Sequence, residues 1–166
     1  MHIYLVQHAE AKKEDEDPLR PLSEKGIHDI QKIASYLSML HIKVDAIFHS
    51  AKLRAKQTAE ILYQALRPMQ GISEKEGLSP LDEPSIIAER LEDTADSLVL
   101  VGHLPHLGRL ASLLLCKDQN KDIISFRMAG VVCLKRDEAK KWSLQWMFIP
   151  DVIIGQDGVR PSCDSL

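Results

Sequence analysis

The stretch IYLVQH, residues 3–8, is a nearly continuous apolar run that ends on a histidine, and LVLVGH, residues 98–103, has the same build. Such runs are typical of strands that are buried on both faces of a parallel sheet. In open α/β sheets, ligands bind beyond the carboxyl ends of the strands. We therefore expect His8 and His103 to meet at one crevice, although they come from distant parts of the chain.

Alternating strand and helix patterns predict the fold class. Apolar or alternating segments predict strands at residues 2–7, 44–50, 97–102, 130–136 and 141–149, with room for a short edge strand within 67–83. Amphipathic segments predict helices at residues 24–40, 51–66, 84–96 and 105–115. This order predicts an α/β fold, a three-layer α/β/α sandwich with a mainly parallel sheet. The last two strands, joined by the charged turn DEAKK, predict some antiparallel pairing near the C-terminus.

Two serines are expected to start helices. Ser23 can cap the first helix, and Ser50 is expected to open the second. In the first helix, the apolar residues that share one face and are expected in the core are Ile27, Ile30, Ala34, Leu37 and Leu40.

Length and composition limit the possible classes of protein. The length predicts a single domain over residues 1–166, with an irregular tail at 150–166. The composition is 45% hydrophobic and 27% charged with a net charge of -3, so we expect no binding to nucleic acid or to a membrane. No apolar run can cross a bilayer, and no secretory signal is visible. We therefore expect a cytoplasmic protein in which Cys116, Cys133 and Cys163 are reduced thiols.

The segment after the second expected strand carries a group suited to phosphate. Arg54 lies in the first turn of the helix that is expected to open at Ser50. Helix N-termini bind anions through free N–H groups, and a guanidinium matches phosphate oxygens. A histidine can attack phosphorus and carry a covalent phosphoryl group. His8, Arg54 and His103 together therefore predict a phosphate site with a nucleophile, because phosphoryl transfer needs mainly positioning and charge neutralisation.

Four segments resemble the motifs of the histidine phosphatase superfamily, which includes the phosphoglycerate mutases. LVQHAEA at 5–11 resembles the family's LVRHGE motif, and HSAKLRAKQTAEIL at 49–62 resembles its SPLxRAxQTAE motif. LVLVGHLPHLG at 98–108 resembles the second histidine motif, and RPLSEKG at 20–26 fits the stretch after the first motif. The matches come in the family's order within residues 1–115. Short members of this kind resemble the SixA-type phosphohistidine phosphatases, and the resemblance implies a phosphoglycerate mutase-like fold.

The resemblance implies roles for matching positions. His8 matches the nucleophile that becomes phosphorylated, and Arg54 matches the second phosphate-binding arginine. His103 matches the histidine that contacts the transferred phosphoryl group. Arg20 matches an arginine of the early loop that is expected to face the site, and Ser50 is expected among the phosphate contacts.

Three positions depart from the family's motifs. Gln7 stands where the family has its first arginine, Ala9 where it has a glycine, and Ala51 where proline is usual. Gln7 can donate a hydrogen bond to phosphate and is expected to contact it, but it carries no charge. One charge-assisted hydrogen bond contributes roughly 1.5–3 kcal/mol, or about ten- to a hundredfold in rate or affinity. We therefore expect Gln7 to weaken activity rather than abolish it.

The general acid is the least defined part of the predicted site. Larger relatives use a carboxylate to protonate the leaving oxygen, and the candidates here are Asp82, Glu83 and Glu10. A phosphohistidine substrate needs less help, because imidazole is a better leaving group than an alkoxide. HLPH at 103–106 lacks the helical HExxH pattern, and HAE at 8–10 is not followed by PCxxC. We therefore expect neither a metal nor another cofactor.

The predicted function is metal-independent dephosphorylation through a covalent phosphohistidine at His8, with a histidine-phosphorylated protein as substrate. The interval between Arg54 and His103 is too short for the lid of larger relatives, so we expect a shallow, open site. Two alternatives stay open. One is a phosphatase of small phosphomonoesters, which would need a working acid. The other is a non-catalytic module that binds phosphorylated partners, and Gln7 is its main support.

Overall fold

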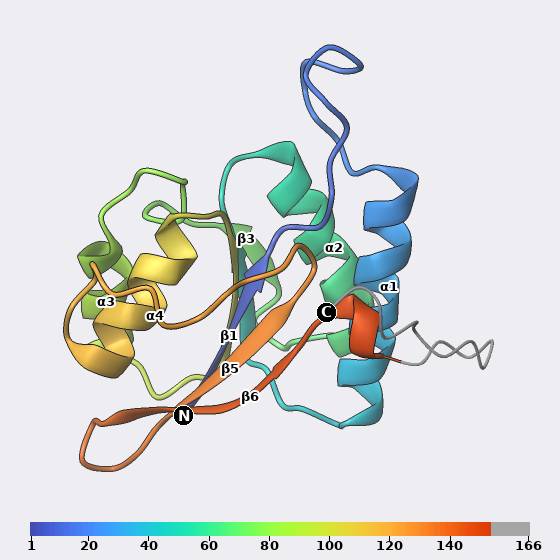
Figure 1. Cartoon of the computed structure of the whole chain (residues 1–166). Coiled ribbons are helices and arrows are strands. Elements are labelled where there is room, and N and C mark those ends of the chain that lie inside the picture. Colours follow the sequence, from blue (N-terminus) through green and yellow to red (C-terminus); the bar gives the residue numbers. More distant parts are fainter. Residues whose placement is uncertain (154–166) are drawn as a thin grey trace.

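A computed structural model describes residues 1–153, which form a six-stranded sheet with helices on both faces (Figure 1). The elements in chain order are β1 (His2–Gln7), α1 (Glu24–Met39), β2 (Ala46–His49), α2 (Leu53–Leu66), β3 (Ile72–Glu74), α3 (Pro84–Glu92), β4 (Leu98–Gly102), α4 (His106–Cys116), β5 (Val131–Arg136), β6 (Trp142–Phe148) and the 3-10 helix η1 (Pro150–Val152). Within residues 1–153, no helix is long and apolar enough to span a membrane. Most of the tail that is expected to be irregular, residues 154–166, lies outside the described part.

The strand order β3-β2-β4-β1-β5-β6 places β1 and β4 side by side in the middle of the sheet. The strands β1 to β4 are parallel, whereas β5 runs antiparallel to both β1 and β6. The last pair in the β1–β4 register is Gln7 with Gly102. The residues that follow, His8 and His103, therefore leave the sheet at the same edge. The predicted mainly parallel sheet with antiparallel pairing near the C-terminus is confirmed.

The sheet separates two apolar clusters. Helices α1 and α2 pack on one face, and α3 and α4 pack on the other (Figure 1). Alternate residues of β1 enter opposite clusters, because successive side chains of a strand point to opposite faces. Val6 belongs to the cluster with α1 and α2, and Leu5 belongs to the cluster with α3 and α4. Both faces are covered, which explains the continuous apolar run of β1 and confirms the three-layer sandwich.

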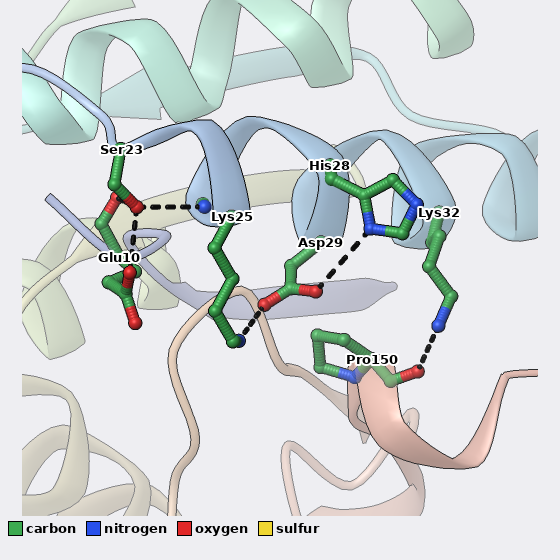
Figure 2. Close-up of polar contacts among 8 residues, drawn as sticks. Glu10, Ser23, Lys25, His28, Asp29, Lys32 and Pro150 are labelled. Atoms are coloured by element: carbon green, nitrogen blue, oxygen red, sulfur yellow. Dashed lines mark hydrogen bonds and ion pairs between the residues drawn. The ribbon is translucent and has the colours of Figure 1, made fainter. Parts of the chain in front are cut away.

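The first turn of α1 is fixed to the loop that follows β1 (Figure 2). Ser23 Oγ accepts a hydrogen bond from the Gly26 N–H at 3.0 Å, which confirms Ser23 as the helix cap. The same hydroxyl donates to Glu10 Oε1 at 2.7 Å. Gly26 packs so closely on this loop that a Cβ atom would lie 2.0 Å from the Glu10 carbonyl oxygen. The loop just past His8 therefore requires glycine at this position.

The start of α2 differs from the sequence prediction. The helix begins at Leu53 with Lys52 as its N-cap, so Ser50 does not open it. The Ser50 hydroxyl instead lies 2.5 Å from His103 Nε2. Ser50 Oγ also accepts a hydrogen bond from the Lys52 N–H at 3.4 Å, so the hydroxyl joins the segment before α2 to a buried ring.

The end of α3 is also earlier than predicted. The helix stops at Glu92 rather than at residue 96. The Asp96 N–H donates to Thr94 Oγ1 at 3.0 Å, a local turn that competes with helical hydrogen bonds. The Ser97 N–H is bound by Asp45 Oδ2 at 2.7 Å, which aligns the chain for β4.

The predicted buried face of α1 is partly wrong. Its buried members are Ile30, Ala34 and Leu37, with Ile33 in addition. Ile27 and Leu40 are 39% and 43% exposed. Leu40 follows the last helical residue as the C-cap, and Ile27 lies in the first turn of the helix.

The cysteines lie in different surroundings. Cys133 is buried in β5, and burial raises the pKa of its thiol to about 12. Cys116, at the end of α4, is exposed. Cys163 lies outside the described residues.

The close packing of Gly26 gives a stability test with an internal control. Gly26→Ala should lower the free energy of unfolding by about 1–3 kcal/mol, because the new methyl group must displace the Glu10 backbone. In Gly108→Ala, the Cβ would only touch Leu104 Cδ2 at 3.7 Å, so that variant should gain about 0.5–1 kcal/mol from helix propensity. Urea unfolding of both variants measures the difference. Equal stability of the two would show that the Glu10–Gly26 contact imposes no constraint.

Candidate active site

His8 and His103 meet at the carboxyl end of the two central strands. The His8 N–H donates to the Gly102 carbonyl at 3.0 Å, so the pairing of β1 with β4 extends to the first residue of the site. The two imidazole centroids are 4.8 Å apart, with 56° between the ring planes. His8 is 8% exposed and His103 is 2% exposed. The sheet register thus brings two buried imidazoles into one place.

The hydrogen bonds of His8 define its tautomer. Nδ1 lies 2.8 Å from the Ala9 carbonyl oxygen. A carbonyl can only accept, so Nδ1 carries the proton. Nε2 accepts a hydrogen bond from Arg54 Nε at 3.2 Å. Both contacts describe a neutral imidazole whose free lone pair is on Nε2 and faces a guanidinium.

The surroundings of His8 also keep it neutral. Burial is the main cause that lowers the pKa of His8 to about 4, and the positive charges of Arg54 and Arg20 lower it as well. The hydrogen bond with Ala9 opposes this shift. Burial and the charge of Arg20 also lower the pKa of Arg54. Both guanidinium groups therefore act on His8 through their charges. With its pKa lowered to about 4, His8 has an unprotonated Nε2 at neutral pH.

His103 is held through Ser50, at the end of the neighbouring strand β2. Ser50 Oγ lies 2.5 Å from His103 Nε2. Burial lowers the pKa of His103 to about 3, and the charges of His8, Arg54 and Lys52 add to the shift. His103 Nδ1 is buried and has no hydrogen-bond partner within residues 1–153. His103 is therefore a second neutral imidazole beside His8, and its Nδ1 has no hydrogen-bond partner among the described residues.

The structure also brings Gln7 and Arg20 to this place. Gln7 is the last residue of β1 and is 8% exposed, and its side-chain Oε1 has no partner among the described residues. Arg20 lies in the segment between β1 and α1, with a φ of 51° and its Nε donating to the Lys12 carbonyl at 3.4 Å. Its charge acts on the pKa of His8. Gln7 thus directly precedes His8, and the Arg20 guanidinium acts on His8 through its charge.

Two of the three candidate acids lie beside another histidine of the site region. Asp82 Oδ2 accepts a hydrogen bond from the Ser79 N–H at 2.9 Å, and Glu83 is the N-cap of α3. Burial lowers the pKa of His106, while the charges of Asp82 and Glu83 raise it. His106 is fully buried, and neither ring nitrogen has a partner in the described chain. Both carboxylates thus act on His106, which follows His103 by three residues.

The third candidate acid, Glu10, belongs to the start of α1. Its carboxylate accepts the hydrogen bond from Ser23 that Figure 2 shows. The Glu10 carboxylate therefore binds the serine that caps α1. In residues 1–153, no three His, Cys, Asp or Glu side chains gather as metal ligands would.

Thr58, which the sequence analysis missed, links two segments of the site through hydrogen bonds. Thr58 Oγ1 accepts a hydrogen bond from the Ala9 N–H at 3.0 Å and donates to the Arg54 carbonyl at 2.7 Å. Thr58 is fully buried, so this link joins α2 to the chain just past His8. A threonine inside a helix gives no sign of a tertiary contact. Its only sequence signal is its place in the RAKQTAE motif.

Comparisons with known proteins show the family of this chain. The family model described as "Histidine phosphatase superfamily (branch 1)" matches residues 3–82. An uncharacterised protein of Picosynechococcus sp. is 34% identical over 148 residues, which are 84% of this chain and 88% of that protein. The chain belongs to the histidine phosphatase superfamily.

Within this superfamily, the chain is similar to a protein of known activity. Phosphohistidine phosphatase SixA of Escherichia coli K12 is 22% identical over 155 residues, covering 90% of this chain and 94% of SixA. The structure of SixA complexed with tungstate has a TM-score of 0.79 and 22% identity, covering 90% of this chain and 97% of that chain. The predicted histidine phosphatase fold is therefore confirmed.

The lowered pKa of His8 predicts a pH dependence of stability. In the unfolded chain, the His8 ring regains a pKa near 6.5, so between pH 6.5 and about 4 the unfolded state binds more protons than the folded state. The contribution of His8 to stability is thus complete above this window and decreases as the pH falls through it. Unfolding free energies of wild type and His8→Gln should therefore change differently between pH 7 and 4, with the steeper loss in wild type. A His8→Gln slope equal to that of wild type would contradict this account.

Proposed function

We propose that this protein is a metal-independent phosphatase that acts through a covalent phosphohistidine at His8 and removes phosphate from phosphohistidine on a protein. The observation that carries this proposal is the neutral His8 ring, whose Nε2 lone pair lies 3.2 Å from Arg54 Nε. A neutral imidazole is a nucleophile, and a cation beside it can hold the incoming phosphoryl group. The histidine phosphatase fold and the similarity to SixA support this reading.

The proposed reaction has two displacements. In the first, the Nε2 lone pair of His8 forms a bond to phosphorus while the N–P bond of the substrate breaks. The electron pair of that bond stays on the substrate imidazole, which takes a proton from solvent. In the second, water attacks the phosphorylated His8, the new N–P bond breaks, and inorganic phosphate leaves. In both displacements, the Ala9 carbonyl accepts a hydrogen bond from the Nδ1–H of His8, and this bond would stabilise the positive charge of the phosphorylated ring.

The proposed binding of the phosphoryl group uses the groups around Nε2. Arg54 would turn its N–H donors from Nε2 to the phosphoryl oxygens, and Arg20 would add positive charge. His103 Nδ1 is buried without a partner within residues 1–153 and would donate a hydrogen bond to a phosphoryl oxygen. Gln7 would donate through its amide N–H groups, because its Oε1 can only accept. These donors would add to the charges of Arg54 and Arg20 in stabilising a phosphoryl-transfer transition state. SixA's complex with tungstate, a tetrahedral oxyanion, supports a site of this kind.

A protein phosphohistidine fits this site better than a phosphate ester. Imidazole leaves more easily than an alkoxide, so the reaction does not depend on a strong acid next to His8. SixA, the relative of known activity, is a phosphohistidine phosphatase. A second candidate is a phosphatase of small phosphomonoesters, and the observation in its favour is the pair Asp82 and Glu83 beside His106. Turnover of an aryl phosphate that falls on Asp82→Asn or Glu83→Gln would support this second candidate.

The proposed function is tested with a histidine-phosphorylated protein. Wild type should release inorganic phosphate in the presence of a metal chelator, and it should act on the same protein phosphorylated on serine much more slowly. Release that needs added metal, or a preference for the phosphoserine form, would overturn the proposal. Tight phosphate binding without any turnover would instead favour the non-catalytic module.

The roles of two adjacent residues can be separated by substitution. His8→Ala should abolish turnover, because no other group supplies the covalent bond. Gln7→Ala should reduce kcat/KM only about two- to tenfold, the value of one neutral hydrogen bond. Steady-state kinetics on the phosphohistidine protein measure both variants. Similar residual activity in the two would argue against covalent catalysis by His8.

Restoring a positive charge at position 7 should raise activity. Gln7→Arg places a guanidinium where the family motif has arginine, so kcat/KM should rise by roughly ten- to a hundredfold. The assay compares both forms at matched ionic strength, with Gln7→Met as an uncharged control of similar length. No increase in Gln7→Arg would mean that a positive charge at this position does not contact the phosphoryl group.

A further inference from the structure

A groove of about 630 Å³ lies between the start of α4 and the loop at 119–126. We call it the α4 groove. Leu104, which directly follows His103, opens it, and Gly108 and Arg109 continue it along the helix. Lys121 and Phe126 are on the opposite wall. The groove therefore starts one residue along the chain from His103.

The wall opposite α4 is fixed in place. The Ser112 hydroxyl donates to the Lys121 carbonyl, and Phe126 is only 7% exposed. Just beyond this wall, the Ala129 N–H donates to the carbonyls of Gln7 at 3.1 Å and His8 at 3.4 Å. These contacts tie the wall to α4 and to the end of β1. The α4 groove is thus preformed, and a preformed site costs less free energy to occupy than one that must be ordered on binding.

The lining of the α4 groove has a distinct chemistry. Leu104 is 42% exposed and presents an apolar side chain at the mouth. Neither Arg109 nor Lys121 forms an ion pair within residues 1–153, and Asp122 is the one carboxylate in the described lining. The exposed Lys52 adds a cation on the active-site side, because its charge acts on His103. An occupant with an apolar side chain and negative charges complements this surface.

We propose that the α4 groove binds the polypeptide segment next to the phosphohistidine of the substrate protein, and that this segment is acidic. This inference rests on the proposed function, because Leu104 of the groove directly follows His103 in the chain. An apolar side chain of the segment would pack on Leu104, and its carboxylates would pair with Arg109 and Lys121. The groove would then select among phosphohistidine proteins, while the chemistry at His8 stays the same.

Gly108 offers a way to change the groove without touching the proposed catalytic residues. It lies in α4, and a Cβ atom there would meet only Leu104 Cδ2 at 3.7 Å. A longer side chain at this position would project into the α4 groove that Gly108 lines. Gly108→Glu and Gly108→Lys are a matched pair, because they fill similar space with opposite charge.

The test uses two synthetic peptides of equal length that carry one phosphohistidine, one flanked by glutamates and the other by lysines. Wild type should show a kcat/KM about tenfold higher for the acidic peptide. Gly108→Glu should lose about tenfold on the acidic peptide, whereas Gly108→Lys should keep or increase the preference. All three proteins should act on free phosphohistidine within about twofold of each other, and circular dichroism should show equal folding.

Several outcomes would overturn the inference. Equal turnover of the two peptides by wild type would show that the groove does not select for charge. Equal losses of kcat/KM on the acidic peptide in Gly108→Glu and Gly108→Lys would show that the groove does not prefer an acidic segment. If wild type turns over neither peptide nor free phosphohistidine, the proposed function fails. Fluorescence anisotropy of the labelled peptides then tests the groove by itself, and equal affinity for both peptides would overturn it.

Discussion

The hydrogen bond from His8 Nδ1 to the Ala9 carbonyl is the contact on which the proposed chemistry depends. It sets the tautomer, and the tautomer decides that the free lone pair is on Nε2. The carbonyl is itself held in place, since the Ala9 N–H is bound by Thr58, and Thr58 is bound to the Arg54 carbonyl. One buried network therefore orients both the imidazole and the residue that carries the neighbouring guanidinium.

The sheet supplies the second constraint. Because β1 and β4 are parallel neighbours in register, the residues that follow them leave the sheet together. Apolar clusters on both faces fix these strands, and little freedom remains at their ends. Burial at this edge then lowers the pKa values of His8 and His103 to about 4 and about 3. The proposed nucleophile is thus unprotonated at neutral pH without a carboxylate bonded to its ring.

Much of this arrangement could be predicted from the sequence. The apolar runs that end at His8 and His103 predict parallel strands, and the strand ends predict their meeting, because both inferences use short-range patterns with a fixed geometric meaning. The capping of α1 by Ser23 could also be predicted, because it too depends on a short-range pattern. Ser50 shows the limit, since local propensity predicts a helix cap, whereas its hydroxyl contacts His103 in the fold. Thr58 and the α4 groove depend on contacts between distant segments, and no local pattern encodes these.

The proposed role of His8 Nε2 is tested most directly by the position of the phosphate in the trapped phosphoenzyme. Wild type is mixed rapidly with a phosphohistidine protein and quenched in alkaline denaturant, which preserves N–P bonds. Mass spectrometry then locates the phosphorylated residue, and phosphorus NMR identifies the ring nitrogen. The account predicts phosphate on Nε2 of His8. Phosphate on Nδ1 of His8, or on any other residue, would contradict it.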